Sequence, residues 1–243
     1  MNFFSQILYA SDTVLQCVLL FFLLRGPFRR YIVFGLYVVG AFAADLAEGL
    51  VYYRLGWESP IYRRLYWTDK VTLELLLFLV VIAFTYAALQ DNPLRPKAAK
   101  ILGVIVAVAL ALPISMLRHH HNRTYGAFTS QWFNQASQVW NFGAAIMNLV
   151  LWTALLSNRR RDPQLVTLSI GVGIATASGA IAWGARQWLA ESNRWPVDIF
   201  RAVAGLASIL LWCWAFRPKP AGHSSSPKPP SNAPSPEALT TPS

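Results

Sequence analysis

The sequence predicts an all-α bundle of seven transmembrane helices, and three observations lead to that fold class. Hydrophobic residues make up 55% of the 243-residue chain and charged residues only 13%, a composition typical of membrane proteins. The apolar residues gather in seven stretches of about twenty, the length of helix that crosses a hydrocarbon core of about 30 Å. No stretch shows the alternating pattern of an outer-membrane barrel strand. We therefore expect an integral membrane protein without a soluble catalytic domain.

The seven predicted spans are joined by short segments, so neighbouring helices should pack antiparallel. The spans cover residues 4–24, 31–53, 69–90, 98–117, 133–157, 164–190 and 197–216, within one transmembrane domain over residues 1–216. Residues 217–243 are dominated by Pro, Ser, Ala and Thr without apolar periodicity, which predicts a disordered cytoplasmic tail. The connection from Arg54 to Thr68 is rich in aromatic rings, and we expect it to lie flat on the outer leaflet.

The basic residues predict the orientation of the bundle. A net charge of +10 would suit a nucleic-acid partner, but the Lys and Arg side chains lie in the segments that flank the spans. With the N-terminus outside, the outer connections hold seven of them and the inner segments hold twelve: Arg25, Arg29, Arg30, Arg95, Lys97, Lys100, Arg159, Arg160, Arg161, Arg217, Lys219 and Lys228. Cytoplasmic segments carry the excess, so we expect N outside and C inside. We expect a bacterial cytoplasmic membrane and no nucleic-acid partner.

Charged and amide side chains inside the spans form the candidate binding site. A charge at the centre of a span costs about 2.5–3.5 kcal/mol and usually faces the bundle interior or a wet cavity. The candidate ligand-binding residues are Asp45, Glu48, Glu74, Asn141, Arg186 and Arg201, with Asp12 deeper in span one. In the predicted orientation all lie towards the outer side, and Asp45 lies roughly 12 Å below the outer end of its helix. We expect a polar pocket that opens to the outside.

Two structural interpretations compete with a ligand site. Arg186 and Arg201 are close enough to their helix ends to place the charged group in the interface while the stem stays buried. Alternatively, acids and arginines pair between helices, for example Glu48 with Arg186, and fix the packing of the helices. Neither interpretation needs a ligand.

Small residues and a proline predict how two spans pack. Gly171, Ala175 and Gly179 recur four apart in span six, which allows neighbouring backbones to approach closely and predicts a central helix. Pro113 interrupts span four near its outer end and should kink it or end its regular hydrogen bonding.

The histidines exclude several catalytic classes and leave one metal hypothesis open. No histidine lies within a span, which excludes bis-histidine haem ligation, a transmembrane HExxH metalloprotease and an intramembrane Ser–His hydrolase. The consecutive residues His119, His120 and His121 could bind zinc or copper, or belong to a solvated outer loop. Consecutive loop residues do not converge easily, so we assign no metal ligand and no cofactor. With no nucleophile identified, we do not expect an enzyme.

Two resemblances to known families are limited to topology or to one dipeptide. The seven-helix layout with an external N-terminus resembles that of retinal proteins and seven-helix receptors. Retinal proteins need a lysine in the last helix, and Val197–Phe216 contains none. Pro163 and Gln164 resemble the dipeptide of the PQ-loop transporters, but the second copy of that motif is missing.

These features favour a protein of the cell membrane that senses or binds a small ligand through an outward-facing polar pocket. A pocket of carboxylates and arginines suits a small zwitterionic or cationic solute. Because the chain has no output domain, a sensor would need a separate cytoplasmic protein partner. The alternative is a small-solute or proton-coupled transporter with Asp45, Glu48 and Glu74 as titrating groups. Against it are the lack of visible repeats and the lack of charge in the inner half of the spans.

Overall fold

Seven α-helices and no strand make up the part of the chain that the structure describes. The structure is a computed structural model, and it describes residues 3–26, 28–56, 58–90, 92, 95–120, 130–157, 162–189 and 195–217. The helices are α1 (Phe3–Arg25), α2 (Ile32–Leu55), α3 (Pro60–Ala88), α4 (Arg95–His120), α5 (Ser130–Ser157), α6 (Pro163–Trp188) and α7 (Trp195–Phe216). The all-α prediction is confirmed. Beyond Arg217 the predicted tail lies outside the described residues, as do His121 and the side chains of His119 and His120.

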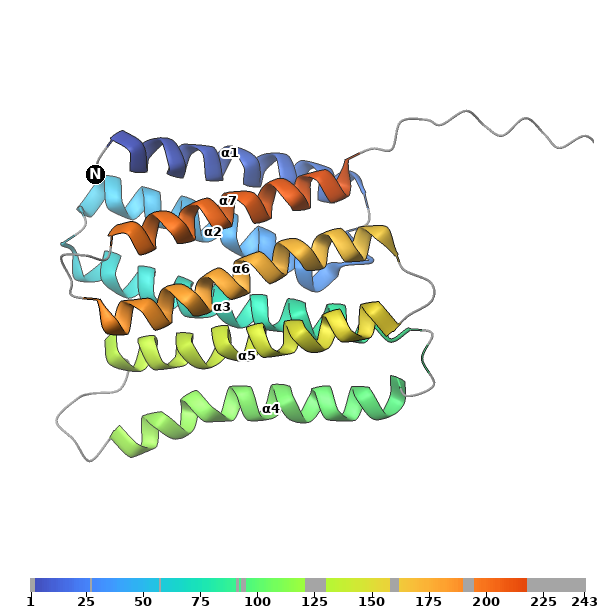
Figure 1. Ribbon diagram of the computed structural model, residues 1–243. Helices are drawn as coiled ribbons and strands as arrows, with labels where there is room; N and C mark the ends of the chain where they lie inside the picture. Colours follow the sequence, from blue (N-terminus) through green and yellow to red (C-terminus); the bar gives the residue numbers. More distant parts are fainter. Residues whose placement is uncertain are drawn as a thin grey trace, which may run out of the picture.

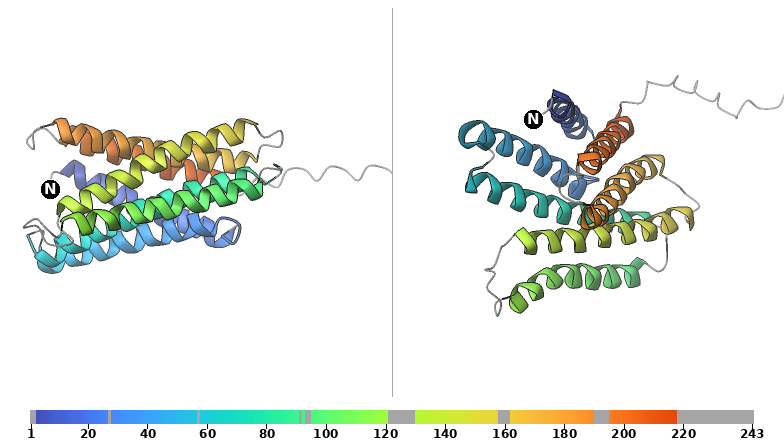
Figure 2. Two further views of the ribbon diagram at one scale, coloured as in Figure 1. Left: turned by 90° about the horizontal axis from the view of Figure 1, so that it is seen from below. Right: turned by 60° about the vertical axis from the view of Figure 1, so that its left-hand side comes forward.

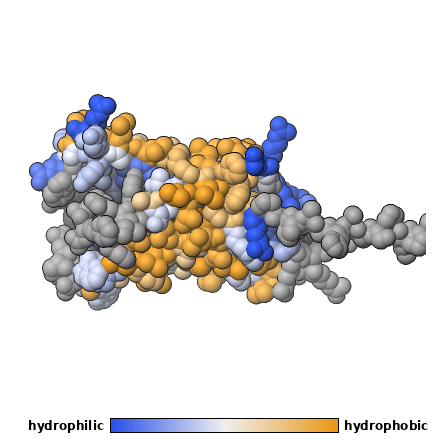
Figure 3. Space-filling model, turned by 90° about the horizontal axis from the view of Figure 1, so that it is seen from above, coloured by the Kyte–Doolittle hydropathy of each residue, from blue (hydrophilic) through white to orange (hydrophobic). Residues whose placement is uncertain are grey.

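Six helices, α2 to α7, are long and apolar enough to cross a membrane. Large apolar side chains cover their outer faces, such as Leu50, 61% exposed, and Leu149, 68% exposed. Figure 3 shows a broad band of apolar residues on one face of the bundle, with hydrophilic residues gathered towards its two ends. Apolar surface of that extent is stable in contact with lipid tails but not in water. The architecture therefore fits a multi-pass membrane protein.

Five helices close into a ring and two lie outside it. Side-by-side contacts run from α1 to α2, α2 to α3, α3 to α6, α6 to α7 and α7 back to α1. Helix α5 packs against α3 and α6, and α4 lies at the edge of the bundle against α5 and α3 (Figures 1 and 2). Helices α1, α3, α5 and α7 begin at the same end, which we call the N-terminal end.

Helix α3 begins earlier than predicted, so the expectation of a flat connection over Arg54–Thr68 was wrong. Gly56 caps the C-terminal end of α2: its positive φ of 75° suits glycine, and its N–H donates to the Tyr52 carbonyl. Ser59 then caps α3 by accepting from the N–H of Ile61, and Pro60 occupies the first turn. No Gly or Pro follows before Ala88, so the aromatic segment continues the helix.

Helix α4 continues through Pro113 because tryptophans of α5 bind the carbonyls near it. A proline has no N–H, so it leaves the carbonyl of the residue four positions earlier, Ala109, without its helical donor. The indole of Trp140 donates to that carbonyl at 2.9 Å, and Trp132 donates to the carbonyl of Pro113 at 2.9 Å. In a lipid environment an unpaired carbonyl is costly. These two hydrogen bonds therefore attach α4 to α5 where its regular hydrogen bonding is interrupted.

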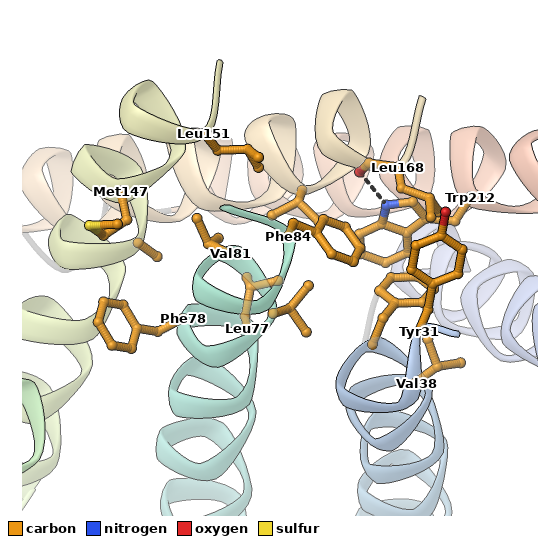
Figure 4. Close-up of a cluster of buried hydrophobic side chains, with 14 of the residues drawn as sticks. Tyr31, Val38, Leu77, Phe78, Val81, Phe84, Met147, Leu151, Leu168 and Trp212 are labelled. Carbon is orange, nitrogen blue, oxygen red and sulfur yellow. Dashed lines mark hydrogen bonds between the residues drawn. The ribbon is translucent and has the colours of Figure 1, made fainter. Parts of the chain in front are cut away.

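Helix α6 is in contact with three neighbours, α3, α5 and α7, in agreement with its stripe of small residues. A Cβ at Gly171 would lie 2.4 Å from Nε1 of Trp212, and one at Gly179 would lie 2.4 Å from Oδ1 of Asn141. The absent side chains thus create the space for two buried residues of α7 and α5. Close approach also allows the Trp212 indole to donate to the Leu168 carbonyl at 3.2 Å (Figure 4).

An aromatic layer fills the ring at the end opposite the N-terminal end. Rings from α2, α3 and α7 and from the residue before α2 pack together: Tyr31, Phe34, Phe84, Trp212 and Phe216. All five side chains are buried, and Figure 4 shows Tyr31, Phe84 and Trp212 meeting there. Aromatic rings near the end of a membrane helix often lie at the membrane–water interface, but these five pack inside the bundle.

Asp162 stabilises this end of the bundle because its carboxylate accepts hydrogen bonds from three groups. Its Oδ1 accepts from the N–H of Gln164 and caps α6, while its Oδ2 accepts from Arg30 at 2.6 Å and from the Tyr31 hydroxyl at 3.3 Å. The Pro163-Gln164 dipeptide therefore has a structural role here, since Pro163 begins the capped helix and Gln164 donates to the Ala215 carbonyl.

Substitution of Gly171 tests the close packing of α6 and α7. We expect Gly171→Ala to lower the free energy of unfolding by about 1–3 kcal/mol, since the buried, hydrogen-bonded Trp212 ring has to shift. Gly184→Ala is the matched control, because a Cβ there meets nothing within 4 Å and should be neutral or stabilising by about 0.5–1 kcal/mol. Thermal unfolding in detergent compares the two. Equal midpoints would contradict the packing described.

Candidate functional site

Glu74 is the most deeply buried acid among the candidate residues, and two neighbouring helices supply its partners. It lies near the middle of α3 and is 5% exposed. Its Oε1 accepts from the indole of Trp183 on α6 at 3.2 Å and from Arg201 on α7 at 3.2 Å. An isolated carboxylate in such a place would be costly. The sequence-predicted residues Glu74 and Arg201 therefore form an interhelical ion pair.

Two more cationic side chains lie against the ring of Trp183, close to Glu74. Lys70, one turn before Glu74, has its Nζ 4.6 Å from the centroid of the Trp183 ring, and the Arg186 guanidinium carbon lies 5.5 Å from it. The ammonium of Lys70 is further surrounded by Tyr66, to whose hydroxyl it donates at 3.4 Å, and by Trp67. Trp183 thus contacts charged groups through both its N–H and its ring.

Arg186 pairs with Asp198 at the start of α7 rather than with Glu48. The predicted pairing of Glu48 with Arg186 was therefore wrong, because the first turn of α7 supplies a nearer carboxylate. We call the assembled residues the Trp183 cluster: Lys70, Glu74, Trp183, Arg186, Asp198 and Arg201. It holds three cationic side chains and two carboxylates, so its formal charge is positive.

Two polar atoms within the Trp183 cluster have no hydrogen-bond partner among the described residues. One is Oε2 of Glu74, an acceptor, and the other is Nε of Arg186, a donor. Buried polar atoms in proteins are nearly always paired, and an exception suggests a bound water, ion or ligand. The Trp183 cluster therefore has hydrogen-bonding capacity beyond what the chain itself uses.

A second polar group joins α1 to α2 in the same half of the bundle. The amide Nε2 of Gln16 donates to Oδ2 of Asp12 and to Oδ2 of Asp45, both at 2.7 Å. We call these three residues the carboxylate cluster. Asp45 lies ten residues before the end of α2, which places it about 15 Å along the helix axis from that end. Glu48 lies nearby, half-buried, and interacts electrostatically with Asp45, Asp69 and Lys70.

Tyr37 of α2 lies near charged residues of both clusters, Asp12 and Asp45 of one and Glu74 and Arg201 of the other. The centroid of its ring is 5.9 Å from that of Trp212. The interior of the five-helix ring therefore carries acidic groups towards α1 and α2 and a cationic excess towards α3, α6 and α7.

Asn141 uses its polar atoms away from both clusters. Its Nδ2 donates to the Ser137 carbonyl of its own helix at 3.0 Å, and its Oδ1 packs against Gly179 of α6. This contact explains the residue as part of the α5–α6 packing. Its predicted ligand-binding role remains a prediction.

Four residues of the clusters were missed from the sequence: Gln16, Lys70, Trp183 and Asp198. Spacing offered a signal for two of them, since Gln16 follows Asp12 by four residues and Lys70 precedes Glu74 by four, positions that share a helix face. For Trp183 and Asp198 no comparable signal exists, because their roles depend on how α6 and α7 are rotated against α3.

Comparisons with known proteins give no further guide to the site. No protein-family model, curated protein or solved structure matched this chain. Of the residues that the structure describes, no three His, Cys, Asp or Glu side chains are grouped so that they could hold a metal ion.

A double-mutant cycle measures the Glu74–Arg201 pair. We expect Glu74→Gln and Arg201→Gln each to lower stability by about 1–3 kcal/mol, since each leaves a buried partner without its counterpart. The double variant should cost less than the sum, by about 0.5–3 kcal/mol. The pair Arg30–Asp162 is the control, because Arg30 is largely exposed and its coupling should be about 0–1 kcal/mol. Additive losses at Glu74 and Arg201 in detergent unfolding would contradict the pairing.

Proposed function

We propose that this protein is a small-ligand-binding module of the membrane, and that the Trp183 cluster binds an anionic group of its ligand. The observation that carries the proposal is the gathering of Lys70, Arg186 and Arg201 around one buried indole. Like charges at close range are unfavourable, and Lys70 interacts electrostatically with both arginines. A carboxylate or similar anion from the ligand would relieve that repulsion.

Lys70 is the best placed of the three cations to bind such a group. Arg201 already donates to Glu74 and Arg186 already pairs with Asp198, whereas the hydrogen bond found for Lys70 is to a hydroxyl. An ammonium has three N–H donors, so Lys70 can add a ligand oxygen without losing Tyr66. The free Nε of Arg186 supplies a further donor. The aromatic rings around Lys70 would exclude water and strengthen the interaction.

We further propose that α1 is a seventh span and that the N-terminal end faces the outside. Helix α1 has 23 residues, long enough at about 1.5 Å per residue to cross a core of about 30 Å. The excess of Lys and Arg in the segments at the opposite end supports this orientation. The Trp183 cluster would then face the outside, and a cytoplasmic partner would meet the opposite end.

The aromatic layer favours a binding module over the alternative of a transporter. Phe34, Phe84 and Trp212 fill the ring between the charged clusters and the opposite end. A transporter would need a polar path to both sides in alternation. In this protein such a path would require those rings to move apart, whereas binding from the N-terminal end requires no such movement.

Ligand-dependent unfolding tests the anion site. Thermal unfolding of the purified protein in detergent would be followed with the straight-chain carboxylates from acetate to hexanoate and with inorganic phosphate. A binding anion should stabilise the folded state by about 2.7 kcal/mol at a hundredfold excess over its dissociation constant. We expect Lys70→Gln, which removes one charge and keeps a donor, to weaken binding at least about tenfold.

The matched control is Asp162→Asn, which disturbs polar contacts at the opposite end and should leave anion binding unchanged. Two results would reject the Trp183 cluster as an anion site. One is that an anion stabilises wild type and Lys70→Gln equally, and the other is that none of these anions stabilises the wild-type protein.

A further inference from the structure

Three arginines at the end opposite the N-terminal end carry charges that the described part of the chain does not neutralise. Arg25 ends α1, Arg29 lies in the connection to α2, and Arg217 follows α7, and all three side chains are exposed. Of the acids that the structure describes, Asp162 alone lies at this end, and it already pairs with Arg30. The surface around the three arginines therefore has an excess of positive charge.

Two of these arginines lie over aromatic rings on the outer faces of α1 and α7. The guanidinium carbon of Arg25 is 4.4 Å from the centroid of the Phe21 ring, and that of Arg217 is 4.9 Å from the centroid of the Trp214 ring. Both rings face outwards, Phe21 at 50% exposure and Trp214 at 52%. A cation over an exposed ring near the end of a membrane helix lies at the level of the lipid headgroups.

The outer faces of α1 and α7 form one continuous surface, because the two helices are neighbours in the five-helix ring and run in the same direction. The thiol of Cys213 donates to the Leu15 carbonyl at 3.7 Å, so the contact between the helices extends into the last turns of α7. Towards the N-terminal end this surface is apolar, with Val14 61% exposed and Leu210 54% exposed. Figure 3, which views the bundle from the side of α1, shows the apolar band ending in hydrophilic residues.

We propose that this surface binds an anionic phospholipid, whose headgroup is attracted by Arg25, Arg29 and Arg217. A guanidinium presents parallel N–H donors that match two oxygens of a phosphate and carries the opposite charge. The acyl chains lie along the exposed apolar side chains of α1 and α7. A zwitterionic phospholipid has the same phosphate, but its own cation offsets the attraction, so the surface prefers a headgroup with net negative charge. The lipid site is separate from the Trp183 cluster, which lies in the other half of the bundle.

The test compares two lipids by thermal unfolding of the full-length protein in detergent. Phosphatidylglycerol, which is anionic, is added at increasing mole fraction, and phosphatidylcholine with the same acyl chains is the zwitterionic reference. We expect phosphatidylglycerol to reach half of its maximal stabilisation at a mole fraction at least about tenfold below that of phosphatidylcholine. Because both lipids are presented in detergent, the result does not depend on which leaflet this end faces.

Paired variants assign the effect to this surface. Arg25→Gln combined with Arg217→Gln should raise the half-maximal mole fraction of phosphatidylglycerol at least about tenfold, since two attractive charges are lost. Arg63→Gln combined with Arg64→Gln is the matched control, because it removes two exposed arginines from the N-terminal end and should leave the effect unchanged. Lys70→Gln should also leave it unchanged, which separates this surface from the Trp183 cluster. Both double variants alter exposed side chains, so the protein should still fold.

A second measurement checks binding without reference to stability. The phosphatidylglycerol that copurifies with the protein from mixed micelles of the two lipids is counted, and Arg25→Gln with Arg217→Gln should retain less than wild type. Equal behaviour of the two double variants in both measurements, or equal stabilisation by the two lipids, would overturn the lipid site. Inorganic phosphate and glycerol 3-phosphate, added without lipid, distinguish a soluble anion. Stabilisation by either that depends on Arg25 and Arg217 would reject a lipid as the occupant.

Discussion

Burial of the Glu74 carboxylate is the constraint on which the arrangement of the helices depends. A charge at that depth is stable only with partners, and Trp183 and Arg201 supply them from α6 and α7. The indole that donates to Glu74 also contacts Lys70 and Arg186 through its ring. Three helices are thereby fixed in rotation about one another. Where lipid replaces water, such polar contacts and close packing specify the fold, because apolar burial between helices provides little preference.

Different kinds of side chain fill the interior of the five-helix ring at its two ends, and that difference suggests the function. At one end, aromatic rings fill the interior and Asp162 secures the surrounding segments. At the N-terminal end, charged groups fill it, and atoms of Gln16, Glu74 and Arg186 keep unused hydrogen-bonding capacity. If stability alone shaped this region, apolar residues of similar size would serve as well or better. A polar interior that is closed at one end suits the binding of a solute more than its passage.

The helices were predictable from the sequence and the contacts between them were not. Apolar length placed most helix ends within a few residues, and only the Ser59-Pro60 start of α3 was missed. The cost of a charge in lipid identified Asp45, Glu74 and Arg201 as interior residues, since charges within spans almost always face the bundle. Which residues meet depends on the rotation and tilt of the helices, and the composition of a span carries no information about either. The partners Trp183 and Asp198 therefore emerge only from the structure.

The orientation of the charged end is the claim on which a ligand-binding role rests, and cysteine labelling in intact cells tests it directly. In a background with Cys17 and Cys213 replaced by alanine, Trp195→Cys places an exposed thiol at the N-terminal end, and Ser157→Cys places one at the opposite end. A membrane-impermeant maleimide should label the cysteine at 195 in intact cells and the one at 157 only after permeabilisation. The reverse pattern would place the Trp183 cluster on the cytoplasmic side and contradict an outward-facing site.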